Sequence, residues 1–141
     1  MIEIAPISPG IFTANANGIG VPAAVVLRTD AAGAQSVIPV FTCGAMAGSC
    51  SPAPLDISGP ATFDLILFGT GIRGRSSLFG VFVRIGLNRV FPAQYAGPQG
   101  TFPGLDQINV RLLSVLAGSG EVDLELAFDG EVSNRTRIAF Q

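Results

Sequence analysis

Three groups of residues in this sequence could take part in chemistry, and the first is a glycine-rich segment. Gly69, Gly71 and Gly74 in FGTGIRG have the G-x-G-x-x-G spacing of dinucleotide-binding turns and follow an apolar run. That fingerprint works only where a helix follows, because the N-terminus of the helix faces the pyrophosphate. The next residues, RSSLFGVFVRIG, have the pattern of another strand, and the first acidic residue after Gly74 is Asp106. We therefore expect a glycine-shaped turn between two strands.

The second group is a pair of carboxylates, Asp123 and Glu125, two residues apart on one face of a predicted strand. About 6.6 Å of backbone separates them, at ~3.3 Å per residue, which is close to the separation of the two carboxyl groups in some glycosidases. An arginine beside a carboxylate favours its charged form, whereas a general acid needs a proton to donate. Because Arg137 and Arg135 follow in the next predicted strand, we expect a solvated charged face and no catalytic residue.

The register of this last hairpin follows from the pattern of its apolar residues. A two-residue Asp-Gly turn would set Leu124 opposite Arg135 and mix the two faces. A three-residue loop, Asp129–Glu131, instead sets Asp123 opposite Arg137 and Glu125 opposite Arg135. We therefore predict the three-residue loop, with Gly130 in the left-handed conformation.

The third group is a set of polar residues on predicted loops: Arg73, Arg75, Tyr95 and Gln99. Planar guanidinium groups suit carboxylate or sulfate recognition, and an exposed tyrosine beside a polar groove suits a sugar. These four residues are the predicted contact set if the chain binds carbohydrate. No metal site and no cofactor are predicted, because the aspartates are scattered and no D-x-D-x-D-G calcium loop occurs.

Two cysteines, Cys43 and Cys50, enclose the segment CGAMAGSC. The spacing is wrong for a redox C-x-x-C motif, and no further Cys or His could complete a zinc site. A disulfide is the simpler interpretation, and two buried thiols are the alternative. If the disulfide forms, the compartment is oxidising, which favours an exported protein.

Composition excludes several classes of function. The 141 residues include no His, Lys or Trp, and all eight basic residues are Arg, so the usual general base, Schiff-base lysine and commonest metal ligand are missing. A net charge of -2 without a basic cluster argues against nucleic acid. Pro, Gly or a charge interrupts every apolar run before the ~18 residues of a membrane span, so none is predicted.

The elements that must position these residues are short strands, and we predict an all-β fold, an immunoglobulin-like antiparallel β-sandwich with an N-terminal strand extension. Residues 1–141 form a single domain in this interpretation, with an arm and edge strands in 1–60 and the immunoglobulin-like core in 61–141. Pro39 within its predicted strand indicates an edge strand or a bulge. The predicted strands, separated by Gly, Pro, Asn, Asp or Ser, are 21–28, 35–43, 63–68, 78–86, 89–97, 105–113, 121–128 and 133–140.

Four stretches also carry a resemblance to a known family: SPGIFTANANGIGVPAAVV, LILFGTGIRGRSS, YAGPQGTFPGLDQINVRL and LAGSGEVDLELAFDGEVSN. From about Pro9 to Gln141 the chain resembles the C-terminal domain family at the ends of large exported, mostly uncharacterised proteins of soil bacteria. It is also similar to immunoglobulin-like, IPT/TIG-type modules of surface proteins. Leu113 departs from the pattern, which tends to have Pro after N-V-R-L. The resemblance implies a sandwich fold and a secreted or cell-surface setting within a longer chain, and it transfers no catalytic or ligand-binding residue.

These observations favour a non-catalytic structural or adhesive terminal module of an exported bacterial protein. Its expected partners are upstream domains of the parent protein or another surface protein, because a small sandwich cannot bury all of its apolar residues. The same apolar surplus allows a homo-oligomer. The alternative is a carbohydrate-binding module whose partner is a polysaccharide.

Overall fold

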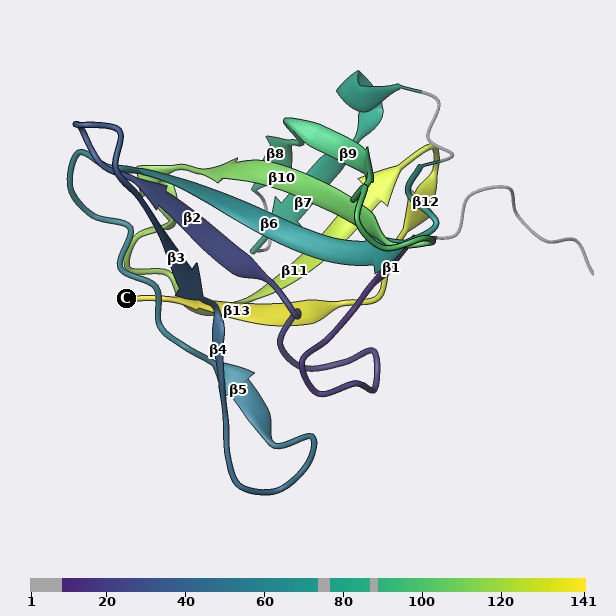
Figure 1. The fold of residues 1–141 in the computed structure, drawn as a ribbon, viewed down its shortest axis with the longest axis horizontal. Coiled ribbons are helices and arrows are strands. Elements are labelled where there is room, and N and C mark those ends of the chain that lie inside the picture. The colour runs from purple at the N-terminus through teal and green to yellow at the C-terminus, as the bar shows by residue number, and fades with distance from the viewer. Residues whose placement is uncertain (1–8, 74–76, 87–88) are drawn as a thin grey trace, which may run out of the picture.

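The computed structural model describes residues 9–73, 77–86 and 89–141, and these residues form antiparallel β-structure in two layers (Figure 1). The first sheet contains β1 (Gly10–Ile11), β2 (Val25–Thr29), β3 (Gln35–Pro39), β6 (Thr62–Thr70), β9 (Tyr95–Pro98) and β10 (Asp106–Leu112). The second sheet contains β7 (Phe82–Ile85), β8 (Val90–Pro92), β11 (Gly120–Phe128), β12 (Glu131–Val132) and β13 (Thr136–Phe140). A separate hairpin consists of β4 (Phe41–Cys43) and β5 (Cys50–Pro52), and η1 (Leu78–Gly80) and η2 (Ser114–Leu116) are single 3-10 turns.

The predicted all-β sandwich is confirmed, whereas its immunoglobulin-like character stays a prediction. Strand order in the first sheet is β3-β2-β6-β10-β9, and β1 pairs with the far end of β6. In the second sheet the order is β12-β11-β7-β8, and β13 pairs with β11. Because β2 lies between β3 and β6, residues 1–60 contribute an interior strand as well as edge strands. No helix in the described part of the chain is long and apolar enough to cross a bilayer.

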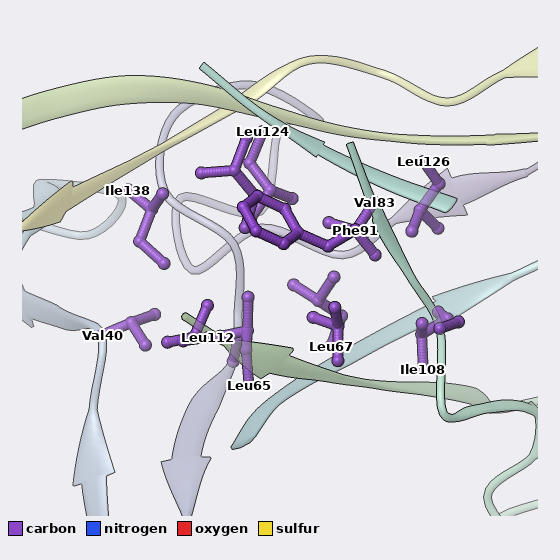
Figure 2. Packing of buried hydrophobic residues seen from close by; sticks show 14 of the residues in the cluster. Val40, Leu65, Leu67, Val83, Phe91, Ile108, Leu112, Leu124, Leu126 and Ile138 are labelled. Carbon is purple, nitrogen blue, oxygen red and sulfur yellow. The ribbon is translucent and has the colours of Figure 1, made fainter. Parts of the chain in front are cut away.

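The core lies between the two sheets because alternate residues of each strand point inward (Figure 2). On β6, Leu65 and Leu67 are fully buried, and they face Leu124 and Leu126 of β11 across the sandwich (Figure 2). Burying one such side chain contributes about 1.5–3 kcal/mol of hydrophobic free energy. The paired layers therefore hold the loops at their ends in fixed positions.

Two of the predicted strands, 35–43 and 89–97, are each divided after a proline. The first gives β3, which ends at Pro39, and β4 in the separate hairpin. The second gives β8, which ends at Pro92, and β9, which belongs to the other sheet. Proline has no N–H to continue a ladder, so the chain can change partners there. The edge position predicted for Pro39 is confirmed.

The last hairpin confirms the predicted register but not the predicted loop. Asp123 lies opposite Arg137, as expected. Nearer the turn, however, Phe128 pairs with Glu131, so the loop is the two-residue turn Asp129–Gly130 rather than a three-residue loop. Both turn residues have positive φ, 52° and 79°, which two-residue hairpin turns favour.

One extra residue between β12 and β13 accounts for the change of register. The Ser133 hydroxyl accepts a hydrogen bond from the Leu126 N–H at 2.8 Å, and Asn134 turns its side chain away from β11. The Asn134 amide exchanges hydrogen bonds with both backbone groups of Ile11, at 2.7 and 3.0 Å, and donates to Gly18 O at 2.7 Å. This bulge therefore attaches the N-terminal segment to the second sheet.

Candidate functional site

The described part of the glycine-rich segment, 69–73, ends β6 and begins the turn that leaves it, and among the described residues that follow there is no helix of more than one turn. A Cβ at Gly69 would stand 2.0 Å from the Gly10 carbonyl oxygen, so only glycine allows β1 to pair there. Gly71 has φ of 73° in the turn after β6. Gly74 lies outside the described residues. The predicted strand 78–86 is shorter than expected, because η1 occupies its first part and β7 begins at Phe82.

Arg73, the first residue of the predicted contact set, is held by a buried carboxylate. Asp106 is only 1% exposed, and one of its oxygens accepts the backbone N–H groups of Ile72 and Arg73 at 2.8 and 3.1 Å. Its other oxygen accepts from Arg73 Nε at 2.7 Å. Arg73 Nη2 also donates to Leu105 O at 3.2 Å. Arg73 thus fixes the turn to the start of β10, although its side chain keeps substantial exposure.

Tyr95 begins β9, and Gln99 follows the last residue of that strand. The Tyr95 hydroxyl donates to Pro98 O, and a Cβ at Gly97 would stand 3.2 Å from that hydroxyl, so the ring lies over the glycine. Gln99 Oε1 accepts the N–H groups of the two loop residues 101 and 102 at 2.8 and 3.1 Å. Arg73 and Gln99 thus lie close together, because Arg73 Nη2 and Gln99 N both donate to Leu105 O. Tyr95 lies further along β9, opposite Asn109. Arg75 lies outside the described residues.

The carboxylate pair on β11 differs from the solvated face that we expected. Glu125 is only 6% exposed, because Arg84 from β7 and Arg135 cover it with nitrogen–oxygen distances of 2.7 and 3.7 Å. Asp123 remains partly exposed and contacts Arg137 at 3.1 Å. The expectation of a fully solvated pair was wrong for Glu125, because β7 contributes a second arginine that the hairpin alone could not predict. Both carboxylates are bound by guanidinium groups.

An open cavity of about 590 Å³ lies where β7, β11 and β13 meet η2, and sequence reasoning missed it. Arg137 Nε contacts Glu121 at 2.6 Å, and Arg89 Nη1 donates to Val115 O at 2.8 Å. Glu121, Arg137 and Arg89, which line the cavity, are thus bound by other groups of the protein. The cavity is lined by Ile85, Gly86, Arg89, Leu116, Ser119, Glu121, Val122, Asp123 and Arg137.

The outward side of the first sheet presents a group of apolar residues that the sandwich leaves partly uncovered. We define the apolar face as the apolar side chains on the outward side of β2, β3, β6 and β9, which the pairing of these strands places side by side. Val37 is 63% exposed and Tyr95 39%, and the remaining members are half-buried. The apolar face consists of Val25, Leu27, Val37, Ile66, Phe68 and Tyr95.

Polar groups border the apolar face along β10. Gln107 Nε2 donates to Asn109 Oδ1 at 2.9 Å, and Arg111 binds Asp64 through Nε and Nη2 at 2.6 and 3.4 Å. This carboxylate and guanidinium neutralise each other. The face therefore combines apolar side chains with polar groups that carry no net charge.

A signal for this face was present in the sequence. In the run Leu65–Phe68 the residues of both faces of the strand are apolar, which is typical of a strand covered on both sides. Its inward residues Leu65 and Leu67 are covered by the second sheet, whereas Ile66 and Phe68 are only half-buried. The outward side of β6 thus has the composition of an interface.

The predicted disulfide joins Cys43 and Cys50, which lie directly opposite each other in the β4–β5 hairpin. The hairpin projects from the sandwich (Figure 1), and Met46 near its tip is 79% exposed. Asn15 secures its base, because Nδ2 donates to Gly48 O at 2.9 Å and to Cys50 O at 2.8 Å. In the described part of the chain, no group of three or more Cys, Asp or Glu side chains is placed to hold a metal ion.

Comparison with known proteins finds no relative of this chain. No family model matches the chain, and no curated protein and no solved structure matches it. The function must therefore be argued from the two outward faces, the cavity and the hairpin.

Proposed function

We propose that this chain is a non-catalytic contact module of an exported bacterial protein, which binds the uncharged surface of a neighbouring protein domain through the apolar face. The observation that carries the proposal is the outward side of β6. Ile66 and Phe68 lie on the central strand of a sheet whose only outward ion pair among the described residues, Asp64–Arg111, is internally neutralised. A partner with an apolar and uncharged surface fits such a face, because removing it from water leaves no unpaired charge behind.

The environment of the carboxylates supports the non-catalytic part of the proposal. Asp64, Asp106, Asp123 and Glu125 each lie beside at least one arginine, within 2.6–3.9 Å. Each of these carboxylates is thus held in an ion pair within the protein. The disulfide supports an oxidising compartment and hence export.

Photocrosslinking with a matched pair of positions tests this proposal. In cells that produce the chain, p-benzoylphenylalanine replaces Phe68 on the apolar face or Phe82 on the outward side of the second sheet. We expect a discrete crosslinked protein from position 68 and little or none from position 82, with the partner peptide identified by mass spectrometry. Equal crosslinking at both positions, or none at position 68, would overturn the proposal.

A polysaccharide partner is the second candidate, and one observation favours it. Tyr95 is partly exposed beside Asn109 on the same sheet face, and Asn109 Nδ2 has no hydrogen-bond partner among the described residues. An aromatic ring beside amide donors is a suitable platform for a sugar ring and its hydroxyl groups.

Binding of the disulfide-intact chain to a panel of soluble and insoluble polysaccharides tests this second candidate. Micromolar binding that Tyr95→Ala and Asn109→Ala both abolish would place the sugar on the sheet face. Arg73→Ala is the control, since Arg73 is bound to Asp106 at one end of that sheet. Absence of binding across the panel would eliminate the candidate.

A further inference from the structure

The edge strands of this protein contain prolines at one kind of position. β3, β5, β8 and β9 each end in a proline, namely Pro39, Pro52, Pro92 and Pro98. In an antiparallel pair, the backbone N–H and C=O of a residue point either toward the partner strand or away from it, in alternation. The hydrogen bonds made by residues next to the ends of each strand show whether the proline faces its partner strand or the open edge.

For β3, Asp30 N donates to Ala34 O at 3.0 Å, which makes these two residues a hydrogen-bonded pair. Alternation along the β2–β3 register then places the backbone groups of Gln35, Val37 and Pro39 on the outward edge. Pro39 therefore removes no hydrogen bond from the ladder. It removes one outward N–H and leaves an outward carbonyl.

The same argument places Pro92 and Pro98 on outward edges. Ala93 N donates to Val81 O at 3.0 Å, so Pro92 faces away from β7. Gln99 N donates to Leu105 O at 2.9 Å, so Pro98 faces away from β10, and the Tyr95 hydroxyl binds the Pro98 carbonyl. These prolines shorten the edges that another strand could join.

The outer edge of β13 is blocked in another way. Leu55 N donates to Ala139 O and Gln141 N donates to Leu55 O, each at 2.9 Å, and Arg137 N donates to Gly20 O at 2.8 Å. The chain itself thus covers this edge. Neighbouring backbone takes up the groups that β13 would otherwise offer to a partner.

Among the edges considered above, only β3 has two residues, Gln35 and Val37, whose backbone N–H and C=O groups both point to the open edge. Among the described strands β3 pairs only with β2, so by this alternation the N–H groups of Gln35 and Val37 point away from the sheet. The strand QSVIP has no charged side chain, and Val37 is well exposed. Edge strands are usually protected by charge, so an open and uncharged edge is a potential pairing surface.

We propose that two copies of this chain pair through β3, antiparallel, about a two-fold axis at Val37. In this arrangement Val37 exchanges both of its backbone hydrogen bonds with Val37 of the second copy. Each Gln35 N–H donates to the Pro39 carbonyl of the other copy. The missing N–H of Pro39 then falls opposite the Gln35 carbonyl and leaves no donor unsatisfied. The proposal does not depend on the proposed function, because it uses the backbone edge of β3, from which only Val37 also belongs to the apolar face.

A second copy fits this edge because the edge is self-complementary. A two-fold axis at Val37 sets this residue opposite its own copy and brings the two β3 strands together, so like charges on β3 would repel, and β3 has none. The first sheet would continue from one copy into the other. Such a contact is small, so we expect a weak dimer, with a dissociation constant on the order of 10 µM to 1 mM.

Sedimentation velocity of the disulfide-intact chain over that concentration range tests the proposal, with two variants and a matched control. Val37→Pro removes the central N–H, as Pro39 does naturally two residues later, and should weaken the dimer at least ten-fold. Val37→Lys places two ammonium groups together and should do the same. Val37→Thr keeps the N–H and the β-branched shape, so it should dimerise as the original chain does. Melting temperatures check that each variant folds.

Amide hydrogen exchange identifies the surface that is used. At dimer-forming concentrations the Gln35 and Val37 amides should exchange more slowly than in dilute solution, whereas the outward Val90 amide of β8 should not change. A chain that stays monomeric up to 1 mM overturns the proposal. So does a dimer that survives both Val37→Pro and Val37→Lys. A dimer weakened instead by Phe68→Gln would show that the apolar face is the contact, and would also overturn pairing through β3.

Discussion

The outward sides of the two sheets are built from the same kind of alternating strand but differ in the number of ion pairs that they carry. On the second sheet, three of the eight arginines, Arg84, Arg135 and Arg137, alternate with acidic residues of β11. On the first sheet, one pair, Asp64–Arg111, is the only outward ion pair among the described residues. Most of the outward ion pairs thus lie on the second sheet, which also exposes Phe82, Val90 and Val132.

The difference shows how a chain with few charges can direct its contacts. Ion pairs across neighbouring strands set register, although each exposed pair contributes at most about 1 kcal/mol. They also keep the second sheet hydrated, so association there would desolvate several charges. Association through the first sheet would desolvate one neutralised pair. Three of the four predictions below concern the two faces, and the fourth concerns a residue outside both.

The largest effect is expected at the turn that sets the register of the charged sheet. Gly130 has φ of 79°, a conformation that a β-branched residue rarely adopts, so Gly130→Val should destabilise the protein by about 2 kcal/mol or more. Gly130→Asn is the control, because asparagine tolerates the left-handed region. Thermal or urea unfolding measures both. Equal stability of the two variants would show that the turn does not control the hairpin.

The next effect compares one carboxylate from each face. Glu125→Gln should cost about 1–2 kcal/mol, because Glu125 is buried beneath two arginines that remain partly exposed. Asp64→Asn, on the first sheet, should cost less than about 1 kcal/mol, because its carboxylate is more exposed. Urea unfolding of both variants gives the comparison. The contrast between the faces would fail if Asp64→Asn proved the more damaging substitution.

A smaller effect is expected when one phenylalanine on each face is replaced. Phe68→Gln and Phe82→Gln should each change stability by about 1 kcal/mol or less, because neither side chain is in the core. Phe68→Gln should nevertheless shorten retention on a hydrophobic interaction column more than Phe82→Gln does, because Phe68 belongs to the continuous apolar face. The reverse order of retention would contradict our assignment of that face.

The smallest effect concerns Asp56, which lies outside both faces and serves as a baseline. Hydrogen bonds from the Ser58 hydroxyl and then from the Ser58 N–H lower the pKa of Asp56 below its ordinary value. The lowered pKa stabilises the folded state above the unfolded-state pKa, and this contribution is lost as pH falls through the folded-state pKa. An NMR titration should show a low midpoint that Ser58→Ala raises. An unchanged midpoint would exclude the hydrogen bonds as the cause.

Sequence patterns predicted most strands and one register, but not the changes of partner between strands. The alternation of Val122, Leu124 and Leu126 fixed the pairing of Asp123 with Arg137. It could not show the bulge after β12, because that bulge depends on hydrogen bonds of Asn134 to a segment more than a hundred residues away. Long-range contacts of this kind leave little local signal.

The predicted contact residues show the same limit. Arg73 and Gln99 do meet beside Leu105. The polar groups of Arg73, Tyr95 and Gln99, however, are bound by neighbouring backbone and by Asp106. Residue type alone cannot show whether a loop side chain is free to bind a ligand. The sequence did contain a signal for the apolar face, because residues on both sides of β6 are apolar. The other members of the face could be found only from the pairing partners of each strand.

The disulfide-closed hairpin has a consequence for how this protein can change over generations. Cys43–Cys50 and Asn15 hold its base, so Ala45, Met46 and Ala47 at the tip are exposed and outside the core. Mutations at these three positions should leave folding intact. The tip is therefore where new specificity can evolve with the least risk to the rest of the molecule.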